Sequence, residues 1–400
     1  MKILYHHRTR AADGCRVHIE EMIASLGHLG HEVMVVAPRQ SRAEPSESKG
    51  SGWVPWLRQM LPAACAELLE FAYSFYAFFR LYAAYRRFRP DALYERYNLY
   101  TPTGAWLRTL TRIPVLLEVN APMVAERSEH GGLALKRLAD WTERLSWRSA
   151  DHVLPVTRAL ARHVEAKGVP VERITVIPNG INLEHIPAPV EGDRPKSRFG
   201  LDGKLVLGFI GFMREWHGLD RVVDLLAHPD APPELHLLLV GDGPARASIE
   251  AQAQRLGVST RLTITGFLPH SAVPGYLAAF DVALQPAATE YASPLKLFEY
   301  LQAGRAIVAP DQPNIREVLT DGRNALLFDP AIPASFGDAL LRLCRDDALR
   351  DRLGRAAHAT IAEMNRTWDN NAAEVIELLS RRSAFRGAPS QVARDRFADR

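Results

Sequence analysis

The chain has 400 residues, and its 49 basic and 46 acidic residues leave a net charge of +3. With 47% hydrophobic and 24% charged residues, the composition excludes a mainly disordered chain. The near-neutral charge gives no sign of nucleic-acid binding, and three widely spaced cysteines support neither a disulfide framework nor a zinc site. At about 150 residues per domain, the length predicts roughly two or three domains. The few cysteines and an N-terminus without an apolar signal-peptide core predict a cytoplasmic protein.

The first half of the chain alternates strand-like apolar runs with helical patterns. The runs are KILY, HEVMVVAP, DALYERY, PVLLEV, DHVLPVT and ITVIP. A helix is predicted from about Arg16 and ends at Gly30. Near-continuous apolar strands separated by helices are typical of a parallel sheet that helices cover on both faces. We therefore predict an α/β domain over residues 1–185.

An aromatic-rich segment interrupts this half at residues 53–89. Its longest uncharged run is too short for a membrane-spanning helix, which needs about 20 apolar residues. Arginines at positions 80, 86, 87 and 89 leave two alternatives open. The segment either docks on an anionic membrane surface or forms an amphipathic helix that packs on the N-terminal core.

The same pattern restarts after a proline-containing linker at residues 186–198. The strand-like runs are now LVLGFIG, ELHLLLVG, RLTITG, DVALQP and AIVAP. They predict a second α/β domain over 199–363, then a helix at 364–382 and a disordered tail at 383–400. Two doubly wound domains in tandem place the ligand site at the carboxyl ends of the strands, in the cleft between the domains.

Two glycine-containing turns could bring backbone close to a ligand. Gly14 precedes a helix, where backbone amides attract anions, and Gly241 lies in the VGDGP turn. The turn at Gly14 has neither the GxGxxG nor the GxxxxGK[ST] pattern. For both glycines, an ordinary tight turn is the alternative interpretation.

Arg214 and His217 follow a predicted strand in GFIGFMREWHGLDR. An arginine at the carboxyl end of a strand suits a diphosphate, because its guanidinium binds phosphate oxygens in a fork. The alternative is that Arg214 pairs with Glu215 on the surface while Trp216 is simply packed.

The segment 288–310, ATEYASPLKLFEYLQAGRAIVAP, is the strongest candidate site. Ser293 is predicted to cap a helix with Pro294 at its first position, and Gly304 to end it. The amides of Ser293, Leu295 and Lys296 would then bind an anion, with the Lys296 charge added. Glu299, about one turn further on, suits the vicinal hydroxyls of a ribose, and Glu290 suits a sugar. The alternative is a surface pair between Lys296 and Glu299.

With these motifs in view, the chain resembles the retaining glycosyltransferases of family 4 (GT4, glycosyl transferases group 1). The resemblance extends over nearly the whole chain and rests on VIPNGIN, GFMREWHGLD, VGDGP, SPLKLFEYLQAG and NIREVLTDGRNALLF. It implies the GT-B fold, in which two Rossmann-like domains enclose a cleft and a C-terminal helix crosses back to the N-terminal domain. It also implies a nucleotide-sugar donor on the C-terminal domain, an acceptor on the N-terminal domain, retained anomeric configuration and no metal.

Residue by residue, Glu299 matches the second glutamate of the family's E-x7-E motif, which holds the ribose, and Gly14 matches the glycine loop near the donor phosphates. The sequence also departs from the family pattern. The first glutamate falls on Tyr291, with Glu290 one residue early. The family's arginine and lysine fall on Phe212 and His217, so we assign diphosphate neutralisation to Arg214 and Lys296.

A histidine that many members carry appears here as Asn120, which can bind a sugar hydroxyl but cannot act as a base. The sequence therefore predicts transfer of a hexose-type sugar from a nucleoside-diphosphate sugar to a glycan or lipid-linked acceptor. The setting implied is cell-surface polysaccharide or glycolipid synthesis, with possible peripheral contact with an anionic membrane. Two alternatives stay open: a nucleotide-sugar epimerase of the same fold, and a non-catalytic subunit that binds a nucleotide sugar.

Overall fold

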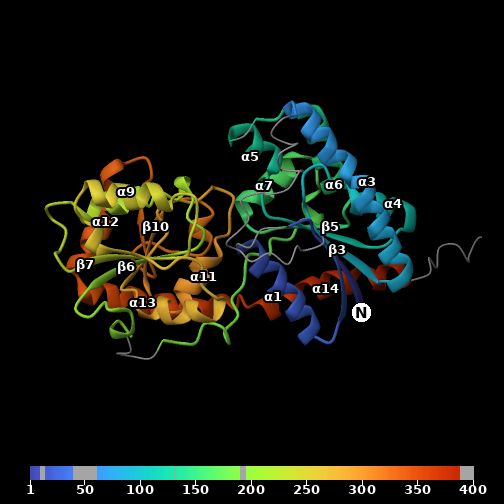
Figure 1. The fold of residues 1–400 in the computed structure, drawn as a ribbon. Coiled ribbons are helices and arrows are strands. Elements are labelled where there is room, and N and C mark those ends of the chain that lie inside the picture. The colour runs from blue at the N-terminus through green and yellow to red at the C-terminus, as the bar shows by residue number, and fades with distance from the viewer. Residues whose placement is uncertain (10–13, 39–60, 131, 190–194, 388–400) are drawn as a thin grey trace, which may run out of the picture.

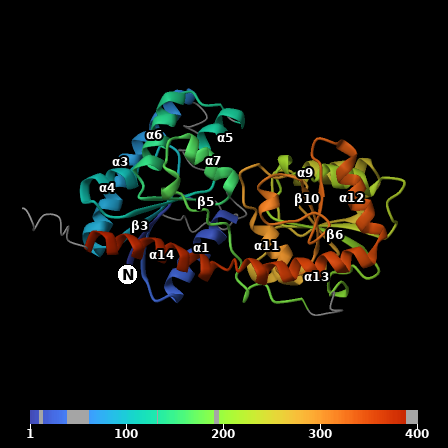
Figure 2. The ribbon, with the colours of Figure 1, turned by 180° about the vertical axis from the view of Figure 1, so that it is seen from behind.

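The computed structural model describes residues 1–9, 14–38, 61–130, 132–189 and 195–387. These residues form two α/β domains that lie side by side, joined along one side by the C-terminal helices (Figures 1 and 2). Both sheets are wholly parallel, with strand orders β2-β1-β3-β4-β5 and β11-β10-β9-β6-β7-β8. The prediction of two doubly wound domains is confirmed.

The N-terminal sheet is buried on both faces. Its strands are β1 (Lys2–His6), β2 (Glu32–Val36), β3 (Ala92–Arg96), β4 (Val115–Val119) and β5 (His152–Pro155). The helices of this domain are α1 (Gly14–His28), α3 (Ala63–Phe88), α4 (Thr103–Thr111), α5 (Met123–His130), α6 (Lys136–Ser149) and α7 (Arg158–Ala166). One apolar cluster, with Leu93, Leu117 and Trp147, covers one face, and another, with Ile3, Tyr5 and Met22, covers the other. Burial on both faces explains why the strands read as nearly continuous apolar runs.

The C-terminal sheet repeats this arrangement with one more strand. Its strands are β6 (Leu205–Ile210), β7 (Leu235–Val240), β8 (Leu262–Ile264), β9 (Val282–Leu284), β10 (Ala306–Pro310) and β11 (Leu326–Phe328). The helices are α8 (Asp220–Leu226), α9 (Arg246–Arg255), α10 (Val273–Ala278), α11 (Leu295–Gln302), α12 (Pro333–Arg345) and α13 (Asp347–Met364). Short 3-10 turns lie at Glu215–His217 and Ile315–Glu317. β11 was not among the predicted strands.

The predicted strand ITVIP is wrong as a strand. Ile174 makes a single isolated bridge to Val153. The extended chain still donates hydrogen bonds from Thr175 to the Val153 carbonyl and from Ile177 to the Pro155 carbonyl. The next amide in this alternation, that of Asn179, donates to Ser293 Oγ instead, so the segment lies along β5 without adding a sixth strand.

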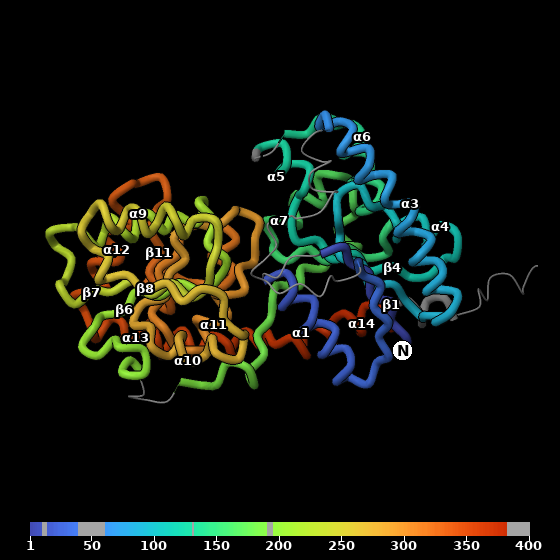
Figure 3. The backbone as a smooth tube through the Cα atoms, in the orientation of Figure 1, coloured from blue at the N-terminus to red at the C-terminus, as the bar shows by residue number. Residues whose placement is uncertain are grey.

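The C-terminal helix crosses between the domains, as the resemblance implied. α13 ends before Asn365, which has a left-handed φ of 52°. α14 (Trp368–Gly387) follows, and it begins four residues later than the predicted start at residue 364. Its buried Trp368, Ala372 and Val375 join the apolar cluster of the N-terminal domain. In the tube view α14 runs directly beside α1 (Figure 3). Of the predicted tail, residues 388–400 lie outside the described residues.

The chain crosses between the domains at two adjacent points. Ile181 lies where the chain passes from the N-terminal to the C-terminal domain, and Thr367 lies where it returns. The two residues form a β-bridge. A Cβ atom on Gly180 would lie 2.8 Å from the Trp368 backbone nitrogen, so only glycine permits this approach. The two crossings therefore form one compact hinge.

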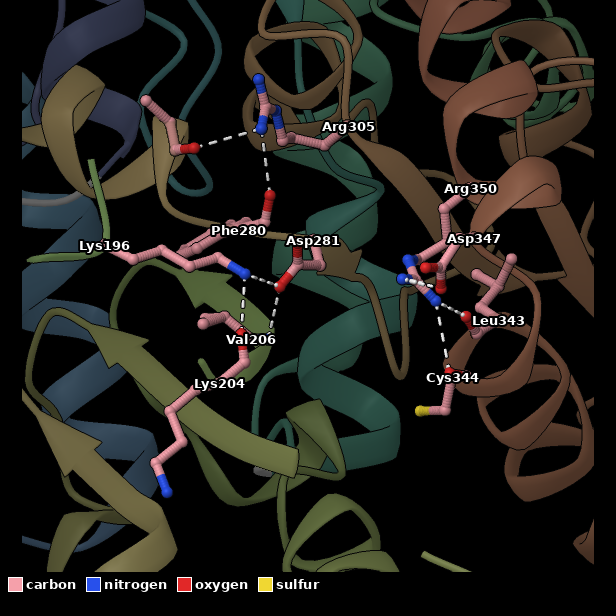
Figure 4. A network of polar contacts seen from close by, with 11 residues as sticks. Lys196, Lys204, Val206, Phe280, Asp281, Arg305, Leu343, Cys344, Asp347 and Arg350 are labelled. Carbon is pink, nitrogen blue, oxygen red and sulfur yellow. Dashed lines mark hydrogen bonds and ion pairs between the residues drawn. The ribbon is translucent and has the colours of Figure 1, made fainter. Parts of the chain in front are cut away.

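The linker enters the second domain through a buried ion pair. Lys196 Nζ lies 2.6 Å from Asp281 Oδ2, which also accepts a hydrogen bond from the Val206 amide at 2.7 Å (Figure 4). Arg305 donates to the Phe280 carbonyl at 3.0 Å in the same region. These bonds anchor the start of β6 to the start of β9, below the edge where the site lies.

Candidate functional site

Lys296 lies in the first turn of α11, against the turn that follows β6. Its Nζ is 3.8 Å from the centroid of the Phe209 ring, and a Cβ atom on Gly211 would come within 3.4 Å of it. Burial lowers the pKa of Lys296 to about 7, while the charge of Glu299 acts in the opposite direction. The structure therefore brings together the two segments to which the sequence assigned the diphosphate. An anion bound here would restore the full charge of this amine.

Ser293 does not cap α11, so that prediction is wrong. The helix begins at Leu295, and Pro294 occupies the cap position without a side-chain hydrogen bond. Ser293 faces the other domain instead: its Oγ accepts a hydrogen bond from the Asn179 amide at 3.3 Å, and its carbonyl accepts one from Asn179 Nδ2 at 2.5 Å. Among the described residues, the amides of Leu295 and Lys296 donate no backbone hydrogen bond. The predicted row of free amides is thus retained without the predicted cap, and Gly304, with φ 61°, follows the helix as expected.

Glu299 lies one turn further along α11 and lines a cavity at the domain interface. The other walls come from α1, from the hinge around Gly180 and from Trp368. Burial raises the pKa of Glu299 to about 7, against the opposing effect of Lys296. Lys296 and Glu299 are both half-buried, and no ion pair joins them among the described residues, so they do not form the exposed surface pair of the alternative. A carboxylate whose ionised form is poorly solvated gains by accepting hydrogen bonds from ligand hydroxyls.

His217 is a neutral neighbour of Lys296. Its ring is buried, and its Nδ1 accepts a hydrogen bond from the Arg214 amide at 3.0 Å. Burial and the charges of Lys296 and Arg214 lower the pKa of His217 to about 3. The proton of the neutral ring therefore resides on Nε2, which leaves His217 as a hydrogen-bond donor rather than a cation.

Arg214 is exposed at the rim of the same turn. Its guanidinium carbon lies 5.1 Å from the centroid of the Phe212 ring. Trp216 is 50% exposed and lies against His217, so the alternative that it is simply packed is wrong. Arg214 thus belongs to the β6 turn and is exposed, whereas Lys296 reaches the same turn from α11 and is half-buried.

The glycines of the VGDGP turn serve the packing of the loops. A Cβ atom on Gly241 would lie 2.2 Å from the Gly211 carbonyl oxygen, and one on Gly243 would lie 2.2 Å from that of Met213. Gly241 also has a φ of 134°, which L side chains rarely adopt. Its contact with a donor stays a prediction, since close packing already requires glycine.

Gly14 begins α1 and faces the start of α11. A Cβ atom there would lie 3.2 Å from Leu295 Cδ1. Two helix N-termini, one from each domain, therefore approach each other across the interface. Because each terminus carries partial positive charge, this arrangement favours an anion between them.

The side chains of Glu290 and Tyr291, which precede α11, lie in different environments. Glu290 is exposed, whereas Tyr291 packs against the apolar core of the N-terminal domain and its carbonyl accepts a hydrogen bond from Thr157 Oγ1 at 2.8 Å. Tyr291, which stands where the family has its first glutamate, therefore contacts the N-terminal domain and links the two domains. The predicted sugar contact of Glu290 is untested.

Asn120 belongs to a buried polar network that the sequence did not reveal. Its Nδ2 donates to Glu118, whose other oxygen lies 2.9 Å from His18 Nε2. His18 Nδ1 lies 2.6 Å from Asn179 Oδ1, and Asn179 contacts Ser293 as described above. The charges of His18 and Arg96 hold the pKa of the buried Glu118 well below its usual range. Polar contacts therefore run from the N-terminal sheet to the start of α11.

Glu317, in the NIREV motif, is a second missed residue. Its carboxylate accepts hydrogen bonds from the amides of Arg158 and Ala159, at 2.8 and 3.3 Å, at the start of α7 in the other domain. Thr157 caps the same helix by accepting from the Leu160 amide at 3.0 Å. The motif is visible in the sequence, but its partner on the other domain is not.

This arrangement suits a nucleoside diphosphate. A half-buried amine and free amides can bind the phosphates, a neutral donor lies beside them, and a carboxylate can accept from hydroxyls. Within the part of the chain that the structure describes, no group of three or more His, Cys, Asp or Glu residues is arranged to hold a metal ion. Two family models match the chain. Residues 13–180 match the glycosyl transferase 4-like domain, and residues 204–346 match the glycosyl transferases group 1 domain. The chain belongs to the group 1 glycosyltransferases.

Two curated glycosyltransferases are relatives of this chain. The 2-deoxystreptamine glucosyltransferase of Streptomyces kanamyceticus is 31% identical over 52% of this chain, which spans 54% of that relative. The GDP-mannose-dependent alpha-mannosyltransferase of Mycolicibacterium smegmatis is 24% identical over 90% of this chain and 93% of its own length.

Solved structures share the fold at low identity. Sucrose-phosphate synthase of Thermosynechococcus elongatus superposes with a TM-score of 0.76 at 17% identity, covering 97% of this chain and all of its own. HepE of Anabaena, solved with UDP-glucose, gives a TM-score of 0.70 at 18% identity, with 95% and 99% covered. These neighbours confirm the GT-B fold of this group 1 glycosyltransferase.

Proposed function

We propose that this protein is a retaining glycosyltransferase that moves a hexose-type sugar from a nucleoside-diphosphate sugar to a glycan or lipid-linked acceptor. The observation that carries the proposal is the start of α11. There the Lys296 side chain lies against the β6 turn, the amides of Leu295 and Lys296 donate no backbone hydrogen bond among the described residues, and Glu299 follows one turn later. The names of the relatives support the donor class, since one depends on GDP-mannose and a structural neighbour holds UDP-glucose.

In this proposal each side chain has a separate task. Lys296 and Arg214 neutralise the diphosphate, which the amides of Leu295 and Lys296 also bind. Glu299 accepts hydrogen bonds from the ribose hydroxyls. His217 donates from Nε2, and Asn120 binds a sugar or acceptor hydroxyl from the N-terminal side.

The reaction is a front-face substitution at the anomeric carbon. The bond from this carbon to the β-phosphate oxygen breaks while the acceptor oxygen bonds on the same face. The acceptor proton passes to the departing phosphate. Preorganised positive charge stabilises the developing diphosphate and is usually the largest contribution to such catalysis. Because Lys296 and the amides supply that charge, the proposed reaction needs no metal, and a chelator should leave the rate unchanged.

The test measures release of nucleoside diphosphate from UDP-glucose and GDP-mannose with a glycan and glycolipid fraction as acceptor. Lys296→Ala should lower turnover by about 10²-fold or more. The exposed Lys136→Ala in the other domain is the matched control and should retain full activity. Near-normal turnover of Lys296→Ala contradicts the assignment. An epimerised sugar without acceptor supports the epimerase instead, and donor binding with neither transfer nor hydrolysis supports the non-catalytic subunit.

The N-terminal domain is the proposed acceptor side and the proposed point of peripheral contact with the inner face of an anionic membrane. α3 packs one face on the core through Ala77, Leu81 and Phe88, as the amphipathic alternative predicted. Its outer face exposes Tyr76 and Phe79, the latter 66% exposed. Within the described residues, no helix combines the length and apolar character needed to cross a bilayer. Residues 53–60 of the proposed contact lie outside the described residues.

A further inference from the structure

Glu118, on β4, is a buried carboxylate that the proposed reaction does not use. Its two oxygens share four partners. Oε1 accepts hydrogen bonds from Arg96, at 2.5 Å, and from Nδ2 of Asn120. Oε2 accepts one from the Tyr94 hydroxyl at 2.7 Å and lies 2.9 Å from His18 Nε2. A carboxylate has about four lone-pair positions, so these partners occupy it completely.

The carboxyl group of Glu118 has no proton to donate. Burial alone would raise its pKa, but the charges of His18 and Arg96 hold that pKa well below its usual range. An ionised carboxylate only accepts hydrogen bonds. The atom that Asn120 turns toward it must therefore be the amide nitrogen Nδ2 and not the oxygen Oδ1, so the orientation of this carboxamide is fixed by chemistry.

The remaining polar atom of Asn120 is open to a ligand. Oδ1 accepts no hydrogen bond from the residues that the structure describes, and it is not one of the buried atoms left without a partner. Asn120 is half-buried and follows β4 at the carboxyl end of the sheet, the edge at which ligands bind. An acceptor, and not a donor, is thus what this side chain presents there.

The network around Glu118 also reaches the donor side of the cleft. His18 Nδ1 lies 2.6 Å from Asn179 Oδ1, and Asn179 Nδ2 donates to the carbonyl of Ser293 at 2.5 Å, just before α11 begins. Asn120 is therefore connected through buried polar contacts to the segment that leads into the proposed diphosphate site. This connection favours the sugar of the donor as the ligand of Asn120.

We propose that Glu118 is the positioning residue of Asn120 and makes Asn120 a hydrogen-bond acceptor for one hydroxyl of the donor sugar. The identity of the ligand rests on the proposed transferase function. An asparagine without such a partner could turn its carboxamide over and either donate or accept. The held carboxamide selects a sugar that donates at this position, because a sugar that cannot donate leaves Oδ1 unpaired.

The test is calorimetric titration of the full chain with UDP-glucose, GDP-mannose and analogues in which fluorine replaces one sugar hydroxyl at a time. Carbon-bound fluorine resembles a hydroxyl in size but has no hydrogen to donate. In the wild type, substitution at one position should weaken binding by at least about fivefold, because it leaves Oδ1 unpaired. In Asn120→Ala, the loss at that position should shrink to within about twofold, since no acceptor remains.

Three further variants test the positioning role. Arg96→Met combined with Glu118→Leu removes both buried charges and leaves neither unpaired, so Asn120 becomes free to turn and the fluorine effect should disappear. Glu118→Gln should keep the effect, because the glutamine oxygen can still accept from Arg96 and Asn120. Tyr94→Phe is the matched control: it removes a partner from the other oxygen of Glu118 and should also keep the effect.

The outcomes separate this proposal from the proposed function. Absence of a fluorine effect in the wild type, or an equal effect in Asn120→Ala, overturns the acceptor role. An unchanged effect in the double variant, or its loss in Glu118→Gln, overturns the positioning role. UDP carries no sugar and should bind every variant equally; if the double variant does not bind UDP, Glu118→Gln decides. If neither UDP nor either nucleotide sugar binds the wild type, the proposed function fails and this proposal falls with it.

Discussion

Lys296 and Glu299 show how the environment of a residue decides its chemistry. Both are ordinary charged residues in sequence, yet burial moves their pKa values toward each other, to about 7 in each case. Holding two poorly solvated ionisable groups in one helix turn lowers the stability of the folded protein, and a bound ligand that interacts with both groups would offset that loss.

The titration of Glu299 should be visible in stability. The folded protein holds a proton on this carboxyl up to pH about 7, whereas the unfolded chain loses it near 4.5. The free energy of unfolding should therefore fall as the pH rises through this window, and Glu299→Gln should remove that fall. Lys296, with a folded pKa of about 7 against 10.5 unfolded, acts in the opposite direction at higher pH.

The measurement is urea unfolding of wild type and Glu299→Gln at several pH values between about 4.5 and 7. Glu290→Gln, an exposed carboxyl just before α11, is the matched control. Parallel curves for wild type and Glu299→Gln would show that the buried carboxyl does not titrate in this window.

At the candidate site, the residues that take part were easier to predict from the sequence than the partners toward which their side chains point. The spacing in SPLKLFEY placed Lys296 and Glu299 one turn apart, because helical periodicity is local. The direction of Ser293 was not predictable, because its partner Asn179 lies more than a hundred residues away in sequence and on the other domain. The neutral state of His217 was hidden for the same reason, since it depends on burial and on Lys296.

At the scale of elements, α7 is held by groups from both domains. Thr157 caps it from its own chain segment, and Glu317 binds its first amides from the opposite side. A carboxylate at a helix N-terminus also interacts favourably with the helix dipole. The two domains are therefore linked at α7 and at Tyr291 in addition to the hinge.

Removing these caps should destabilise the protein and do so cooperatively. Thr157→Ala should cost about 1 kcal/mol, as typical caps do, and Glu317→Gln about 0.3–1 kcal/mol. The double variant should depart from additivity, because both groups serve the same helix. Urea unfolding measures all three, with the exposed Glu165→Gln in α7 as the control, expected within about 0.5 kcal/mol of wild type. An unchanged midpoint for Glu317→Gln would contradict the interdomain cap.

The elements themselves were largely predictable where burial is complete. Strands such as β4 and β7 are buried along their whole length and read as nearly continuous apolar runs, each with one polar residue, Glu118 and His236. β11, with three residues at the sheet edge, carries too short a pattern to stand out. ITVIP has the pattern of a strand, but the next amide in the pairing, that of Asn179, donates to Ser293 of the other domain. A local pattern does not contain such a partner.

At the scale of the whole molecule, α3 presents an exposed aromatic face beside basic residues. If this face docks on anionic membranes, the protein should float with phosphatidylglycerol vesicles, and Phe79→Ala should weaken binding by about tenfold, as expected for one buried aromatic side chain. Leu183→Ala, which alters an exposed apolar residue near the hinge, should bind like wild type. Absence of co-flotation would remove membrane contact from the account.

The central claim is that the start of α11 binds a nucleotide sugar, and binding should therefore be measured before transfer. The measurement is a thermal-shift panel of UDP-, GDP- and ADP-sugars on wild type, Lys296→Ala and Glu299→Ala. We predict that one nucleotide class stabilises the wild type by a few kcal/mol at about 100 times its Kd and fails to stabilise either variant. No shift of the wild type with any nucleotide sugar at high concentration, or an equal shift in all three proteins, would contradict the account.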